Sequence, residues 1–97
     1  MDKREQVLQV IYGAVDDANE ALPPERRLEK SPETILYGVG GKLDSLGLVN
    51  LIVATEQRIE EVFGVVVTLA DERAISQQHS PFRTIGSLAD YAVTLLP

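Results

Sequence analysis

Apolar residues near the start of the chain recur at steps of three and four positions, which is the spacing of one face of an amphipathic helix. They are Val7, Ile11, Ala14, Ala18 and Leu22. The pattern predicts a first helix from about residue 2 to residue 21. The helix should end at Pro23 and Pro24, because proline lacks a hydrogen-bond donor and disfavours helical angles in the residue before it.

Residues 23–43 contain three prolines and three glycines, so the sequence predicts a long loop with no regular element. Loops of this length in small domains are usually functional or held in place by their own side chains. We expect Ile35, Leu36 and Tyr37 to hold this loop. The serine and proline of "SPET" at 31–34 indicate one short helical turn.

The next apolar pattern predicts a second helix from Ser45 to about Phe63, with two adjoining faces. The face expected to enter the core comprises Leu48, Leu51, Ile52, Thr55, Ile59 and Val62. The adjoining face comprises Ser45, Val49, Val53, Glu56 and Glu60. Either its valines widen the buried surface, or this face binds a partner that has a small apolar patch and basic residues around it.

Gly64 is expected to end the second helix in the left-handed conformation, and the β-branched run at 65–67 should form an extended connector. Thr68 with Asp71 three residues later predicts the start of a short third helix over about 69–76. The last helix should begin at Thr84 or Gly86 and direct four residues inward, namely Ile85, Leu88, Ala92 and Leu95.

These elements predict an all-α fold. We expect a small four-helix bundle with three longer helices, a short third helix and a long loop between helices one and two. The length of 97 residues is that of one domain, so residues 1–97 should share one core.

Composition narrows the classes of partner. Fifteen acidic against nine basic residues give a net charge of −6, which disfavours nucleic acid and anionic membranes and favours basic protein partners. With no cysteine and one histidine, disulfides are excluded and a zinc site is not expected. The start of the chain has no continuous apolar stretch, so neither a signal peptide nor a membrane span is predicted, and we expect a cytoplasmic monomer.

Ser45 follows an aspartate at the predicted start of the second helix, where three roles are conceivable. A serine hydrolase needs a base, and the only histidine, His79, lies in a polar segment. The nucleophile-elbow pattern is also absent, since position 43 is Leu43. We therefore expect no enzyme activity. His79, Arg26 and Arg27 are interpreted as solvated residues, with the arginines also able to offset nearby glutamates.

Two roles remain for Ser45: a purely structural one at the start of the helix, and that of an attachment point. Asp44 is expected to cap the helix, which leaves the Ser45 hydroxyl exposed at the positive end of the helix dipole. A phosphate ester on Ser45 would be stabilised there. Gly40 and Gly41 are expected to give the backbone the freedom to bring Asp44 to the helix start.

The stretch "GGKLDSLGLVNLIVATEQRI" at 40–59 resembles the segment around the attachment serine of acyl carrier proteins, in which the D-S-L triplet is the most recognisable feature. The order of the predicted helices and the final "TIGSLADYA" at 84–92 agree with this resemblance. The resemblance implies that Ser45 carries a 4′-phosphopantetheine arm, which a separate phosphopantetheinyl transferase takes from coenzyme A. The thiol of the arm would then hold an acyl group as a thioester.

The resemblance also implies a docking surface. Acyl-loading and acyl-processing enzymes with basic docking sites would bind to it. By position it comprises Asp44, which the transferase would also recognise, with Leu46, Val49, Val53, Glu56 and Glu60. Fatty acid carriers typically have acidic residues where this chain has Gly47 and Asn50. The second helix also looks longer by roughly one turn. We therefore expect a carrier for a dedicated lipid, polyketide or other specialised pathway. A peptidyl or aminoacyl carrier and an unmodified helical docking module are the alternatives, and a serine hydrolase ranks last.

Overall fold

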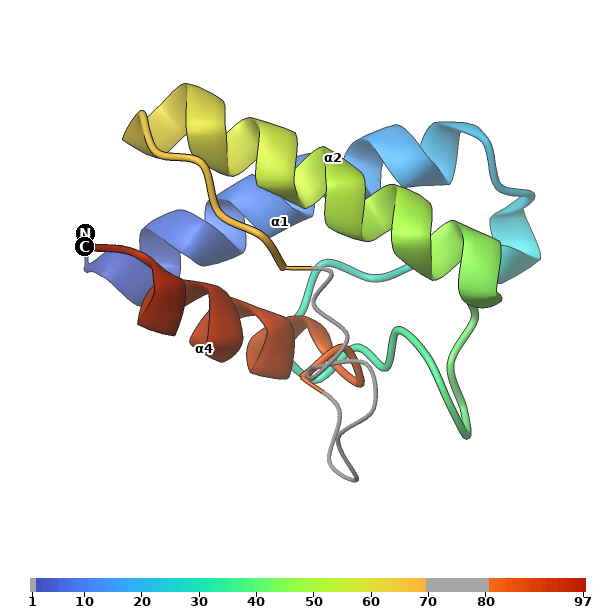
Figure 1. Cartoon of the computed structure of the whole chain (residues 1–97). Coiled ribbons are helices and arrows are strands. Elements are labelled where there is room, and N and C mark those ends of the chain that lie inside the picture. The colour runs from blue at the N-terminus through green and yellow to red at the C-terminus, as the bar shows by residue number, and fades with distance from the viewer. Residues whose placement is uncertain (1, 70–80) are drawn as a thin grey trace.

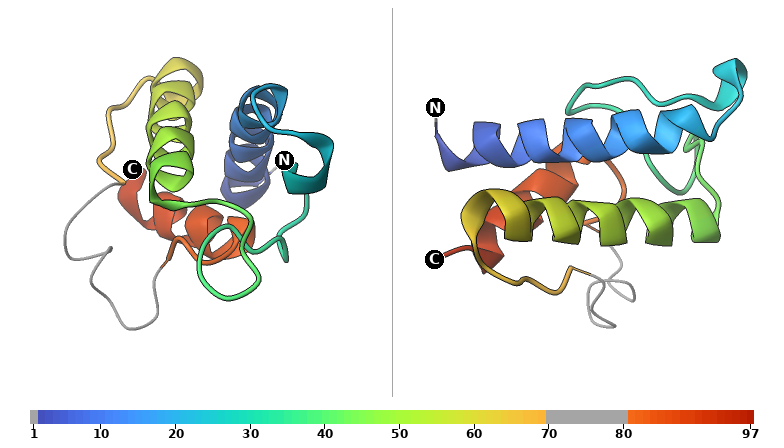
Figure 2. Two further views of the ribbon diagram at one scale, coloured as in Figure 1. Left: turned by 90° about the vertical axis from the view of Figure 1, so that its right-hand side faces the viewer. Right: turned by 90° about the horizontal axis from the view of Figure 1, so that it is seen from above.

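The computed structural model describes residues 2–69 and 81–97. In these two ranges the chain is all-helical, with three helices, α1 (Lys3–Glu20), α2 (Ser45–Phe63) and α4 (Ile85–Leu95), and one short 3-10 turn at Pro24–Arg26. Helices α1 and α2 lie side by side and run in opposite directions, and α4 crosses below the pair (Figures 1 and 2). The all-α prediction is confirmed. The predicted short helix at 69–76 falls almost entirely outside the described residues, so a four-helix bundle stays a prediction.

Helix α1 matches its prediction closely. Asp2 caps it, since the Asp2 carboxylate accepts a hydrogen bond from the amide of Glu5 at 2.8 Å. The predicted apolar face is turned inward, with Val7, Ile11 and Ala14 fully buried. Ala18 and Leu22 pack at the edge of the core. Helix α1 contacts both α2 and α4, so its buried face forms the centre of the core.

Helix α2 begins at Ser45 and ends at Phe63, as predicted, and Gly64 follows in the left-handed conformation with φ of 71°. An L-residue with a side chain is strained in that conformation, which is why glycine suits the end of the helix. The predicted core residues of α2 are buried except Val62, which is 62% exposed. The prediction for Val62 is wrong because α1 presents Gln6 and Gln9 beside it, around an open surface hollow.

Helix α4 begins after Thr84, whose side chain and that of Ser87 bond reciprocally to each other's backbone amides. Ile85, Leu88 and Ala92 are buried as predicted. Leu95 is 39% exposed, so its predicted inward position is wrong. The chain becomes extended directly after the helix, and Leu96 packs against the core instead.

The long loop between α1 and α2 is held at two buried leucines. The amide of Leu28 donates to the side-chain oxygen of Asn19 at 2.8 Å, and the Asn19 side-chain amide donates to the Leu28 carbonyl at 3.0 Å. Leu36 is fully buried, as expected, and Ile35 is half-buried in an isolated antiparallel bridge with Thr84. This bridge fastens the loop to the start of α4.

Two smaller predictions for the same loop have different outcomes. The amide of Thr34 donates to the Ser31 carbonyl at 3.1 Å, which gives the single turn predicted for "SPET". Tyr37, also expected to hold the loop, is 41% exposed and contacts the end of the loop through a hydrogen bond between its hydroxyl and that of Ser45. Its neighbour Leu36 is fully buried in the core.

The connector after α2 is extended, as predicted, with Val66 exposed and Val67 and Leu69 buried. A side chain links the two end segments of the described chain, since the Lys3 ammonium donates a hydrogen bond to the backbone oxygen of Pro97. Figure 1 shows both ends on the side of the molecule opposite the start of α2, and Figure 2 shows that they are separate there. Within the described residues, no helix combines the length and apolar character needed to cross a membrane.

Candidate functional site

The start of α2 is built around the carboxylate of Asp44. Asp44 has extended backbone angles, and its Oδ1 accepts a hydrogen bond from the amide of Gly47 at 2.7 Å. Its carbonyl accepts the first intrahelical bond, from the Leu48 amide at 2.9 Å. Asp44 is therefore the N-cap that the sequence predicts. This cap makes Ser45 the first residue of the helix.

Ser45 is exposed, and its hydroxyl lies 3.2 Å from the hydroxyl of Tyr37. Either oxygen can be the donor in this hydrogen bond. The neighbouring carboxylate of Asp44 is directed at the Gly47 amide. In the described ranges, the hydrogen bond found at Ser45 Oγ thus joins it to a phenol and to neither a carboxylate nor an imidazole. His79 lies outside those ranges.

An apolar face leads away from Ser45 along α2. Its members are exposed: Leu46 at 69%, Val49 at 46% and Val53 at 42%. We call these three residues the Leu46 face. The alternative in which the two valines merely widen the core is therefore wrong. Val39, at the tip of the preceding loop, is 94% exposed and adds a further apolar side chain near the same end of the molecule.

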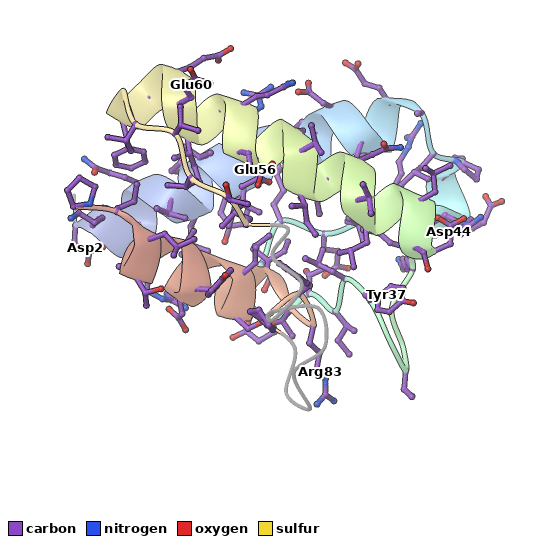
Figure 3. All side chains as sticks on the ribbon, in the orientation of Figure 1. Asp2, Tyr37, Asp44, Glu56, Glu60 and Arg83 are labelled. Atoms are coloured by element: carbon purple, nitrogen blue, oxygen red, sulfur yellow. The ribbon has the colours of Figure 1, made fainter. Side chains whose placement is uncertain are left out.

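The two glutamates predicted to accompany this face differ in their surroundings. Figure 3 shows both on α2, with Asp44 and Tyr37 at its start. Glu60 is exposed. Glu56 is half-buried, and its Oε2 accepts a hydrogen bond from the amide of Leu69 at 2.6 Å. Glu56 therefore also binds the connector that follows α2.

Several basic side chains of this region are engaged within the molecule. The guanidinium of Arg58 binds Asp17 on α1 at 2.5 Å, and this hydrogen bond raises the pKa of Arg58 above its ordinary value. Arg26 donates to the carbonyl of Lys42, and Arg27 donates to the carbonyl of Leu22. The last two are exposed, as the sequence indicates, and they also tie the loop to itself.

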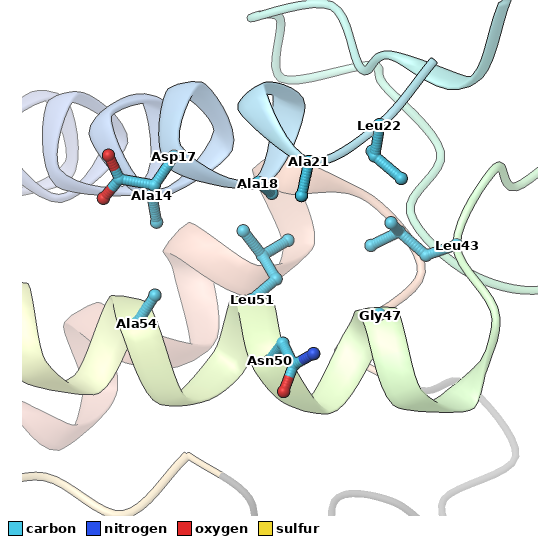
Figure 4. A pocket seen from close by; sticks show the side chains of 10 residues that line it. All are labelled: Ala14, Asp17, Ala18, Ala21, Leu22, Leu43, Gly47, Asn50, Leu51 and Ala54. Carbon is cyan, nitrogen blue, oxygen red and sulfur yellow. The ribbon is translucent and has the colours of Figure 1, made fainter.

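A groove of about 310 Å³ runs between α1 and the first half of α2. Figure 4 shows its lining of small and apolar side chains, with Asp17 and Asn50 as the polar members. Both positions at which the chain departs from fatty acid carriers, Gly47 and Asn50, line this groove. Asn50 is exposed and lies one helical turn after Leu46, whereas Gly47 is half-buried beside Leu43 and Asp44.

Residues that sequence reasoning did not assign to the site are Tyr37, as a contact of Ser45, and Val39. Their sequence context could have identified them, because an aromatic and an apolar residue stand among three glycines, where neither is needed to fill the core. No protein-family model, curated protein or solved structure matches this chain.

Proposed function

We propose that this protein is an acyl carrier protein that bears its cargo on a 4′-phosphopantetheine arm esterified to Ser45. The observation that carries the proposal is the exposed Ser45 hydroxyl directly after a capping aspartate, at the start of a helix of 19 residues. The free thiol of such an arm holds an acyl group as a thioester.

The surroundings of Ser45 fit a phosphodiester better than they fit catalysis by the protein itself. The helix start provides a positive electrostatic potential for an anion. The hydroxyl is open to solvent, so a second protein can reach it. Activation of the serine would come from a phosphopantetheinyl transferase, which agrees with the contact to Tyr37 in place of a base. We accordingly propose that the chain is not an enzyme.

The Leu46 face supports the second part of the proposal, which concerns partners. An exposed apolar stripe beside the attachment serine is suited to a partner with a small hydrophobic patch. The exposed Glu60 and the negative net charge favour basic residues around that patch. Because α2 has Gly47 and Asn50 where fatty acid carriers typically have acidic residues, we propose a pathway other than general fatty acid synthesis.

The test of attachment is an intact-mass measurement. The protein is incubated with coenzyme A, magnesium and a broad-specificity phosphopantetheinyl transferase, together with Ser45→Ala and, as a matched control, Ser31→Ala. The wild type and Ser31→Ala should gain the mass of one phosphopantetheine, and Ser45→Ala should gain none. Absence of any gain in the wild type would overturn the carrier proposal.

A second candidate function, that of an unmodified helical docking module, is favoured by the exposure of the Leu46 face alone. It predicts no mass gain and binding that is lost in Leu46→Ala. A peptidyl or aminoacyl carrier shares the arm and differs in cargo. Supplying acyl and aminoacyl donors with their loading enzymes separates these two, because the loaded mass identifies the cargo.

The proposed pathway has its own test. A ketosynthase of general fatty acid synthesis should process the acyl-loaded protein much more slowly than it processes that pathway's own carrier. The variant Asn50→Glu, which adds a carboxylate at an exposed position of α2, serves as the comparison and should be processed faster than the wild type. Equal rates for the wild-type protein and the fatty acid carrier would contradict a specialised pathway.

A further inference from the structure

Tyr37 is bound to the attachment serine although it lies eight residues earlier in the chain, on the other side of the glycine-rich turn. The two hydroxyl oxygens are 3.2 Å apart, and both residues are exposed. Burial therefore does not force the contact, because each hydroxyl could bond to water instead.

The backbone on the N-terminal side of Tyr37 is fixed by Leu36. The Leu36 side chain is fully buried, and its amide donates to the carbonyl of Arg83 at 2.6 Å. Its carbonyl accepts a hydrogen bond from the amide of Leu43 at 3.2 Å. Leu36 thereby joins the segment before α4 to the segment before α2. Tyr37 therefore directly follows a residue that is buried and has both its amide and its carbonyl hydrogen-bonded.

The backbone after Tyr37 turns back on itself within four residues. The amide of Gly41 donates to the Gly38 carbonyl at 2.9 Å, closing a turn with Val39 at its tip. Gly41 passes so close to Tyr37 that a Cβ on Gly41 would lie 2.8 Å from the Tyr37 backbone nitrogen and Cα. This close approach brings the chain back past the phenol to Leu43 and Asp44, and so places Ser45 beside Tyr37.

We propose that Tyr37 is a positioning residue for the modification of Ser45. The inference rests on the proposed carrier function and assigns to Tyr37 the task of fixing the Ser45 side chain in one rotamer. A serine at an exposed helix start otherwise has three staggered rotamers open to it. Holding the oxygen in one of them raises the fraction of encounters in which it faces the donor.

The transfer step itself uses groups of the transferase and its substrate. Ser45 Oγ forms a bond to the phosphorus that carries the pantetheine in coenzyme A. The bond from that phosphorus to the bridging oxygen of the pyrophosphate breaks, and adenosine 3′,5′-bisphosphate leaves. The Ser45 proton goes to a base on the transferase. Once Ser45 is esterified it has no hydrogen to donate, so the Tyr37 phenol becomes the donor and a charged phosphodiester oxygen the acceptor.

The test compares Tyr37→Phe with the wild type and with Tyr12→Phe, a control that removes the same hydroxyl from α1. Phenylalanine keeps the ring, so the loop should stay folded, which circular dichroism and thermal unfolding verify. Loading by the transferase is followed at varied carrier concentration. We expect kcat for Tyr37→Phe to fall by about 2- to 10-fold, the range of one hydrogen bond. KM should change by less than about twofold, because docking is not altered.

A second measurement reports on the loaded protein directly. The ³¹P resonance of the phosphodiester should shift between the wild type and Tyr37→Phe, and it should coincide between the wild type and Tyr12→Phe. A kcat and a ³¹P shift unchanged in Tyr37→Phe would overturn the role of Tyr37 while leaving the carrier function intact. A wild-type protein that takes up no phosphopantetheine would overturn both.

Discussion

The carboxylate of Glu56, in the middle of α2, accepts a hydrogen bond from the backbone amide of Leu69 at 2.6 Å and so ties the connector to the helix. Leu69 is itself fully buried, and this bond therefore secures a core residue that follows an extended segment. A glutamate that the sequence assigns to partner binding thus contributes to the stability of the fold.

We predict that Glu56→Ala lowers the free energy of unfolding by about 1–3 kcal/mol, the range for losing a hydrogen bond to a charged group. Glu60→Ala, on the exposed side of the same helix, should change it by less than about 0.5 kcal/mol. Urea denaturation of both variants measures the difference. Equal effects of the two substitutions would show that the bond to Leu69 does not stabilise the fold.

Asp44 has two roles that can be separated by substitution. Asp44→Ala should destabilise the protein by about 0.5–2 kcal/mol because the Gly47 amide loses its acceptor. Asp44→Asn retains a side-chain oxygen and should unfold close to the wild type. If the transferase reads the negative charge, Asp44→Asn should load more slowly at unchanged stability. Wild-type stability of Asp44→Ala would contradict the capping role.

Gly41 is predicted to be intolerant of any side chain. In Gly41→Ala the new methyl group would press on the backbone of Tyr37 and Leu36, so the turn must shift. We expect a loss of about 1–3 kcal/mol of stability, typical of overpacking, together with slower loading of Ser45. Val39→Ala, at the exposed tip of the same turn, is the control and should leave stability unchanged. A Gly41→Ala protein that loads and unfolds like the wild type would refute the close approach.

The pH dependence of stability has one defined contribution from the long loop. The hydroxyl of Ser31 donates to Glu33 Oε2 at 2.6 Å, and this bond lowers the pKa of Glu33 below its ordinary value. A carboxyl group with a lowered pKa in the folded state adds stability above its unfolded-state pKa. That stability is lost as the pH falls through the folded-state pKa.

Replacement of Ser31 tests this contribution. Ser31→Ala should raise the pKa of Glu33 toward the ordinary value, as followed by ¹³C NMR of the side-chain carboxyl group. The difference in stability between the two proteins should be largest near neutral pH and should become smaller in acid, where the bond from the Glu33 amide to Ser31 Oγ remains. The same Glu33 pKa in both proteins would show that the Ser31 hydroxyl is not the cause.

The helices were predictable because their signals are local. The prolines after residue 22, the aspartate before Ser45 and the glycine at position 64 each mark a helix end by backbone chemistry alone. The errors at Val62 and Leu95 have a different origin. A periodic pattern gives the direction of a side chain on its own helix, but burial also requires a neighbouring element to cover it.

The candidate site was predictable only in part, for the same reason. Asp44 and Ser45 follow from the sequence around them, whereas the contact of Ser45 with Tyr37 depends on the path of a turn among glycines. That path is set by long-range bonds of Leu36, to Arg83 in one direction and Leu43 in the other. Hydrogen bonds between residues so far apart in the sequence produce no periodic pattern of residue types. The bond from Glu56 to Leu69 was missed because it spans 13 residues.

The position of the two chain ends has a practical consequence. Lys3 and Pro97 lie at the end of the molecule farthest from the start of α2 (Figure 1). A fluorophore, a solid support or a fused protein attached through either end is therefore kept clear of Ser45. Such immobilised protein would still present Ser45 and the Leu46 face to a transferase or an acyl-handling enzyme in free solution.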